Sequence, residues 1–136
     1  MLRISKLTDY AIVLMAEAAM HPFGCVRSAS DLAVSSRIPA PTTEKILKAL
    51  SRGGLLLSHR GTQGGYSLAR PAERISAAEI LRIMEGPIGL TECAFPGTCA
   101  IEKVCPTRQR WQQINRVVTS ALQALSLEDM IGGRSP

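Results

Sequence analysis

Residues 28–69 constrain the fold more than any other stretch, because helix caps, a tight turn and a glycine-rich turn follow one another there. A first short helix over 28–36 starts at a serine, which is a favoured N-cap. A turn at 37–39 leads into a second helix over 40–52, where proline occupies the first turn and a glycine pair marks the end. Two short helices joined by so short a turn predict a helix-turn-helix.

A β-hairpin is predicted directly after the second helix. The apolar run 55–59 and the returning run 66–69 are separated by the turn 60–65, which contains three glycines. Two short strands around a glycine-rich tip are a hairpin pattern. A hairpin that follows a helix-turn-helix is a wing, so the predicted fold class is mainly α with a small β-hairpin (α+β), a winged helix-turn-helix.

Four further segments complete the expected architecture. One helix is predicted to begin at Thr8 as its N-cap, and another begins at Ser76 and ends at a Gly-Pro pair. Residues 87–106 show no periodicity and are expected to be a loop, and 107–125 form a long last helix. The predicted parts are a winged DNA-binding domain over 1–86, a cysteine loop over 87–106, and a dimerisation helix and tail over 107–136.

The last helix carries an apolar stripe that needs a surface to cover it. Trp111, Ile114 and Val118 recur at three- and four-residue spacing along it. The stripe either packs back on its own domain or forms the seam of a two-fold dimer, and a palindromic DNA site would favour the dimer.

The net charge of +5 is concentrated in the middle of the chain. Residues 37–74 carry seven basic and two acidic side chains, whereas 1–36 carry three of each and 75–136 carry six of each. A local basic excess attracts a polyanion, most often nucleic acid. We therefore expect double-stranded DNA as the partner. Neither an apolar run of about 20 residues nor an export signal is visible, so we expect a cytoplasmic protein that does not bind a membrane.

The start of a recognition helix reaches base edges in the major groove, so the residues after Pro41 are candidates for contact with bases. Glu44 would repel phosphate and accept from a cytosine amino group, whereas Lys45 suits a phosphate. Arg60, beside the glycines of the wing tip, is suited to a narrow minor groove. The candidate DNA-binding residues are Ser28, Pro41, Thr42, Thr43, Glu44, Lys45, Lys48, Arg52, Arg60 and Gln63.

Three of the four cysteines lie at equal spacing in the loop, as Cys93-x5-Cys99-x5-Cys105. This is not the paired C-x2-C spacing of structural zinc. Three soft thiolates on one loop suit iron–sulfur chemistry best, followed by zinc with an external ligand, a thiol redox switch and structural cysteines. Cys25 stands alone and is expected to be a small, partly buried apolar side chain.

Four stretches together resemble the IscR-like and NsrR-like transcriptional regulators. They are residues 5–11, 46–55 and 60–69 and the C-x5-C-x5-C loop, and the resemblance covers nearly the whole chain. The opening segment 1–10 is most similar to the branch that regulates the Suf iron–sulfur assembly operon.

The resemblance implies a homodimeric winged repressor of cluster-assembly genes that carries a 2Fe-2S or 4Fe-4S cluster. By position, Cys93, Cys99 and Cys105 would be cluster ligands. Members with a histidine as fourth ligand place it three residues after the last cysteine, where this chain has Arg108. Asp9 matches the carboxylate that other members supply from the first helix of the second subunit, and its alternative role is a charge at a helix N-terminus.

Two alternatives remain on the sequence alone. One keeps the DNA binding and replaces the cluster with zinc or a thiol/disulfide switch. The other is a small iron–sulfur electron carrier, which would not need a basic winged domain. An enzyme is not expected, because a catalytic cysteine needs a nearby base, and no histidine lies close to the three cysteines in sequence.

Overall fold

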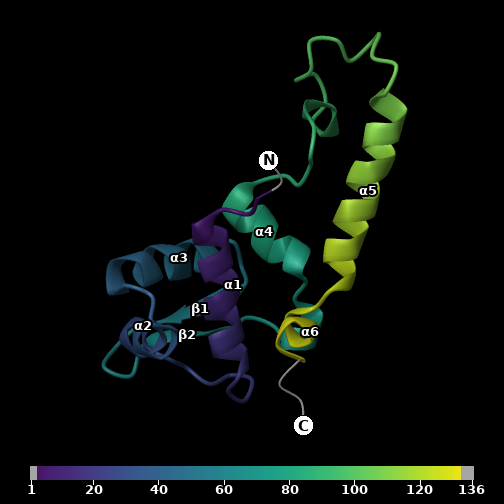
Figure 1. Cartoon of the computed structure of the whole chain (residues 1–136). Coiled ribbons are helices and arrows are strands. Elements are labelled where there is room, and N and C mark those ends of the chain that lie inside the picture. Colours follow the sequence, from purple (N-terminus) through teal and green to yellow (C-terminus); the bar gives the residue numbers. More distant parts are fainter. Residues whose placement is uncertain (1–2, 133–136) are drawn as a thin grey trace.

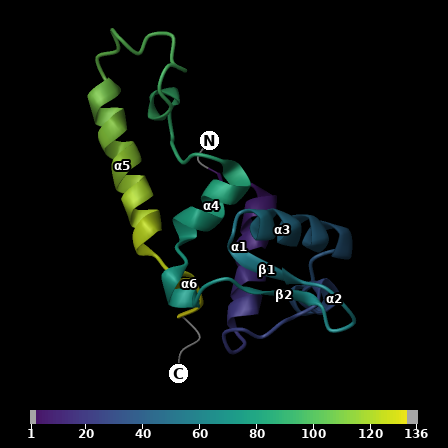
Figure 2. The same cartoon turned by 180° about the vertical axis from the view of Figure 1, so that it is seen from behind.

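The computed structural model describes residues 3–132. Helices dominate, with one two-stranded antiparallel sheet (Figures 1 and 2). In chain order the elements are α1 (Lys6–Ala19), α2 (Ala29–Ser36), α3 (Ala40–Arg52), β1 (Leu56–His59), β2 (Gly65–Leu68), the 3-10 turn η1 (Ala72–Arg74), α4 (Ala77–Glu85), the 3-10 turn η2 (Glu92–Ala94), α5 (Arg108–Ala124) and α6 (Leu127–Ile131). The predicted fold class, a mainly helical winged helix-turn-helix, is confirmed.

Local sequence signals set the helix-turn-helix. Ser28 is the N-cap of α2, and its hydroxyl accepts the amide hydrogen of Asp31. Arg37 ends that helix in the left-handed conformation, with φ of 60°. Helix α3 follows Pro39 and ends at Gly53, as predicted. With these caps, both helices begin and end within one residue of the expected boundaries.

The hairpin pairs Leu56 with Leu68 and His59 with Gly65. Its second strand also pairs with the segment before α2, through the bridge of Arg27 with Tyr66. Gly65 makes this approach possible, because a Cβ there would lie 2.2 Å from the Arg27 carbonyl oxygen. The wing is therefore hydrogen-bonded to the helix-turn-helix rather than free.

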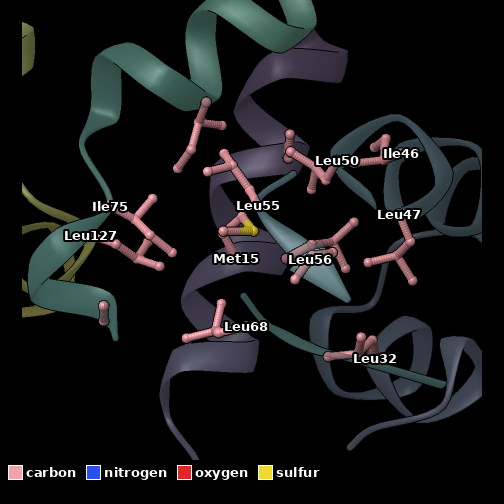
Figure 3. Close-up of a cluster of buried hydrophobic side chains, with 14 of the residues drawn as sticks. Met15, Leu32, Ile46, Leu47, Leu50, Leu55, Leu56, Leu68, Ile75 and Leu127 are labelled. Carbon is pink, nitrogen blue, oxygen red and sulfur yellow. The ribbon is translucent and has the colours of Figure 1, made fainter. Parts of the chain in front are cut away.

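Helix α1 runs through the middle of the winged domain, and the core gathers around it (Figure 3). Met15 from α1 is fully buried among leucines and isoleucines of α2, α3 and the wing. The prediction that Thr8 caps α1 is wrong. Ser5 is the N-cap, and Thr8 lies buried in the first turn.

The C-terminal part leaves the winged domain and returns to it. Helix α4 starts with a capping box of Ser76 and Glu79. Helix α5 stands off the domain, with the cysteine loop reaching its N-terminal end (Figures 1 and 2). Helix α6, which the sequence did not predict, brings the fully buried Leu127 back into the core. Both ends of α5 are thus tied to the rest of the chain.

None of the helices within residues 3–132 is long and apolar enough to cross a lipid bilayer.

Candidate DNA-binding surface and cysteine loop

The recognition helix presents charged side chains on its outer face. Glu44, Lys45 and Lys48 are exposed, while Ile46 and Leu47 between them are fully buried. The helix therefore docks by its apolar side and leaves the charged side free, which is the arrangement that groove binding needs. The exposed candidates on α3 are Pro41, Glu44, Lys45, Lys48 and Arg52, and Thr42 is half-buried.

Thr43 does not belong to this face. Its side chain is fully buried, and its hydroxyl donates to the carbonyl of Ile38, 3.3 Å away. It closes the turn between α2 and α3, so the prediction that Thr43 contacts DNA is withdrawn.

The wing tip exposes Arg60 and Gln63. The turn is tight, because a Cβ on Gly64 would lie 2.4 Å from the carbonyl oxygen of His59. His59 and the buried Ser67 join the two strands through a 2.8 Å contact between Nε2 and Oγ. The strands are therefore held together up to the residue that precedes Arg60.

Ser28 and its neighbour Arg27 lie between the wing and α2. The Ser28 hydroxyl caps α2 and the Ser28 carbonyl accepts from the Leu32 amide, so both groups already have partners within the protein. Sequence analysis missed Arg27. Its guanidinium donates to the Ser35 hydroxyl, and its Nη1 atom is buried with no hydrogen-bond partner in the part of the chain that the structure describes. No local sequence signal marks Arg27, because its backbone is placed by hydrogen bonds to Tyr66 of the wing, far away in the sequence.

The three loop cysteines are all partly exposed free thiols. Cys93 lies in η2, Cys99 in the loop that follows, and Cys105 just before α5. Cys25 is also a free thiol and is exposed, so the prediction that it is partly buried is wrong.

Each end of the cysteine series contacts a threonine hydroxyl. The Sγ of Cys93 lies 3.0 Å from Oγ1 of Thr91, and that of Cys105 lies 3.4 Å from Oγ1 of Thr107. The Thr107 hydroxyl is the main reason that the pKa of Cys105 lies below its usual value. A thiolate, rather than a thiol, is the form that ligates metal.

Asp9 is exposed in the first turn of α1. The start of α1 is held beside the start of the cysteine loop, because Glu85 accepts from the Ser5 amide at 2.9 Å and from the Thr8 hydroxyl at 2.8 Å. Those two hydrogen bonds, the Ser5 amide first, lower the pKa of Glu85. Glu85 is the last residue of α4, immediately before the loop.

Three free thiols on one loop fit an iron–sulfur cluster in donor type. Their positions in a single chain are less favourable. Within residues 3–132, no three His, Cys, Asp or Glu side chains lie close enough together to hold a metal ion. Binding a cluster would therefore require the loop to draw its cysteines together.

Helix α5 leaves its apolar side exposed. Trp111, Ile114 and Val117 are 39%, 41% and 63% exposed, and the only buried residue of the helix is Asn115. Of the predicted stripe, Trp111 and Ile114 are exposed and Val118 is half-buried, so packing on its own domain covers the stripe only in part.

The comparisons with known proteins agree with this architecture. The Mycobacterium tuberculosis protein Rv1287 is 35% identical over 142 residues, which cover 99% of this chain and 84% of that protein. The structure of CymR, the global cysteine regulator of B. subtilis, matches with a TM-score of 0.80 and 29% identity, over 99% of this chain and 100% of CymR. The structure of T. potens IscR matches with a TM-score of 0.75 and 27% identity, over 98% of this chain and 89% of that chain. Residues 4–133 match the Rrf2 family model, which is described as an iron-dependent transcriptional regulator. The chain belongs to the Rrf2 family of winged-helix transcriptional regulators.

Proposed function

We propose that this chain binds operator DNA as a homodimer and that an iron–sulfur cluster on the cysteine loop controls its affinity. The observation that carries the DNA-binding part is the outer face of α3 together with the wing tip. Lys45, Lys48 and Arg60 are exposed there, while the apolar side of α3 is buried in the core. Four of the seven basic residues of 37–74, which are Lys45, Lys48, Arg52 and Arg60, lie on the two elements that a winged protein puts into DNA grooves.

Fluorescence anisotropy at several salt concentrations tests the DNA contacts. The probe is a duplex that the protein itself selects from a random pool. Lys45→Ala and Arg60→Ala should each weaken binding, and each lost phosphate contact should reduce the salt slope by about 0.9. Arg82→Ala is the matched control, because it removes an exposed cation from α4, outside this surface. Equal affinity for all three variants and the native protein would refute the assignment.

The exposed apolar side of α5 supports the homodimer. Burying Trp111, Ile114 and Val117 against the same residues of a second copy removes apolar surface from water, and a two-fold seam makes the patch its own partner. Two recognition helices are then carried in register on one duplex.

Cys93, Cys99 and Cys105 would hold the cluster, with Asp9 of the second subunit as the proposed fourth ligand. A bound cluster would supply a redox-active and oxidant-labile centre, suited to reporting iron or oxidative status. The thiols come from the loop between α4 and α5, so drawing them together changes the connection between the DNA-binding domain and the proposed dimer helix. That change can alter DNA affinity only if the two arrangements bind DNA differently. The output proposed is repression of iron–sulfur assembly genes.

Anaerobic purification tests the cluster. The native protein should be coloured and contain iron and acid-labile sulfide, and Cys93→Ala, Cys99→Ala and Cys105→Ala should each bleach it. Cys25→Ala is the control, since that thiol lies outside the loop and should leave the colour unchanged. A colourless native protein that contains only zinc would overturn the cluster.

A thiol switch is the second candidate, supported by the four free thiols, of which Cys25 is exposed and the three loop cysteines are partly exposed. Reversible oxidation would then change DNA affinity in protein that contains no iron. Metal and sulfide analysis separates the two candidates.

A further inference from the structure

Asn115 is the only buried residue of α5, at 7% exposure. A buried amide needs hydrogen-bond partners, because leaving its polar atoms unpaired is costly. Both polar atoms of the Asn115 side chain are hydrogen-bonded to the start of the cysteine loop. Its Oδ1 accepts the Leu90 amide hydrogen at 2.8 Å, and its Nδ2 donates to Oγ1 of Thr91 at 3.1 Å.

The orientation of this amide follows from its partners. A backbone N–H can only donate, so the oxygen of Asn115 must face Leu90 and the NH2 group must face Thr91. Thr91 Oγ1 then accepts from Asn115, which leaves its hydroxyl hydrogen free to point elsewhere. The Sγ of Cys93, 3.0 Å away, is a partner for it.

The state of the sulfur decides which of the two groups donates. A thiol carries a hydrogen and can donate to Thr91, whereas a metal-bound or alkylated sulfur carries none. In a metal-bound state only the Thr91 hydroxyl can donate, and groups behind a ligand fix its orientation in this way. An alkylated sulfur additionally needs space, and its substituent competes with the Thr91 hydroxyl for that space.

The loop around Cys93 is tightly packed on one side and open on the other. Gly89 folds the loop back so closely that a Cβ there would lie 2.3 Å from the Cβ of Ala94. Cys93 and Asn115 also line a cavity of about 490 Å³ between the loop and α5, so small reagents can reach the sulfur.

We propose that Thr91 and Asn115 are positioning residues that couple the chemical state of Cys93 to helix α5. A ligand or substituent at Sγ that displaces the Thr91 hydroxyl removes one of the two partners of the Asn115 amide, and the hydrogen bond between Asn115 and the Leu90 amide weakens as a result. The coupling rests on the proposed function, in which Cys93 is one of the sensing thiols. It names the contacts through which a change at Cys93 would affect the proposed dimer helix.

The test uses the full chain with Cys25→Ser, Cys99→Ser and Cys105→Ser, without cluster and without DNA. Iodoacetamide alkylates Cys93, and NMR follows hydrogen exchange of the Leu90 amide. Alkylation should speed this exchange by about threefold to tenfold, the range expected when a hydrogen bond is weakened. Because neither cluster nor operator is present, this result is independent of whether the proposed function holds.

Variants at residue 91 decide between the coupling and a general loosening of the loop. Thr91→Val should already exchange faster at Leu90, and alkylation should add less than twofold. Thr91→Ser keeps the hydroxyl and should restore the native response. Thr107→Val is the matched control, because it also removes a threonine hydroxyl from the cysteine loop region, beside position 105, but Thr107 makes no contact with Asn115.

Two results would overturn the proposal. One is an equally large effect of alkylation on Leu90 exchange with and without Thr91→Val, which would show that the Thr91 hydroxyl does not couple Cys93 to Leu90. The other is no change at Leu90 on alkylation of the native sequence. A native-like response in Thr107→Val together with its loss in Thr91→Val would support it.

Discussion

Replacing Leu127 with alanine should destabilise the winged domain, although this residue lies beyond the long helix. Leu127 is fully buried in the core with Met15 and Ile75. A leucine-to-alanine change at such a site costs about 2–5 kcal/mol, because it removes transfer energy and leaves a cavity. That is a large share of the 5–15 kcal/mol or so that typically holds a domain folded.

The segment that carries Leu127 is also fixed by backbone hydrogen bonds. The Leu127 amide donates to the Ile75 carbonyl at 2.7 Å, and the Ala77 amide donates to the Leu125 carbonyl at 2.8 Å. The main chain around the cavity is therefore held in place and collapses poorly, which favours the upper part of the range. A loss of about 4 kcal/mol lowers Tm by roughly 10–15 °C for a domain of this size.

Thermal unfolding followed by circular dichroism measures this effect, with all samples at one protein concentration because dimerisation would shift Tm. Met130→Ala is the control, since Met130 lies on the same short helix and is 44% exposed. It should cost less than about 1 kcal/mol. If Leu127→Ala is as mild as Met130→Ala, α6 does not belong to the core and the reasoning is wrong.

Three further predictions follow from other contacts. Gly65→Ala should distort the wing and lower both Tm and DNA affinity, because the new Cβ would lie 2.2 Å from the carbonyl oxygen of Arg27. Gly132→Ala is the control and should change neither, because no atom lies within 4 Å of a Cβ at that position. Equal Tm values for the two variants would contradict the close approach at Gly65. The folded-state pKa of Glu85 is lowered, so its contribution to stability is present above its ordinary value of 4.5 and is lost as the pH falls through the folded-state pKa. Urea unfolding should accordingly show Glu85→Gln less stable than the native protein at pH 7 and the gap closing below pH 4.5; a gap that does not depend on pH would refute the ionic role. Val117→Glu should give monomers in analytical ultracentrifugation, since it puts a charge on the exposed apolar side of α5. Gln113→Glu is the control and should leave the dimer intact. Dimers of both variants would show that the dimer interface lies elsewhere.

The helix-turn-helix and the wing could be predicted because their signals are local. A serine cap, a first-turn proline and a glycine stop each lie within one or two residues of the boundary they set. The start of α1 was misplaced because Ser5 and Thr8 are both acceptable caps. Only the fold shows that Thr8 is buried and donates to Glu85, 77 residues away.

The features that sequence patterns missed depend on distant partners or on very short elements. Helix α6 has five residues, too few for a period, although its capping box of Ser126 and Asp129 is a recognisable signal. Asn115 lies 24 and 25 residues from its two partners, and on a helical pattern it is simply one more polar residue. Thr43 has the right position for a base contact, but the turn before α3 takes its hydroxyl.

Operator affinity with and without the cluster tests the central claim most directly. Anaerobically purified native protein and the Cys93→Ala, Cys99→Ala, Cys105→Ala triple variant would be titrated with the selected duplex before and after removal of iron by a chelator. We predict that iron removal changes the affinity of the native protein at least tenfold and leaves the triple variant, which already has the cluster-free affinity, unchanged. Equal affinity of the native protein in both states, or the same change in the triple variant, would contradict control of DNA binding by the cysteine loop.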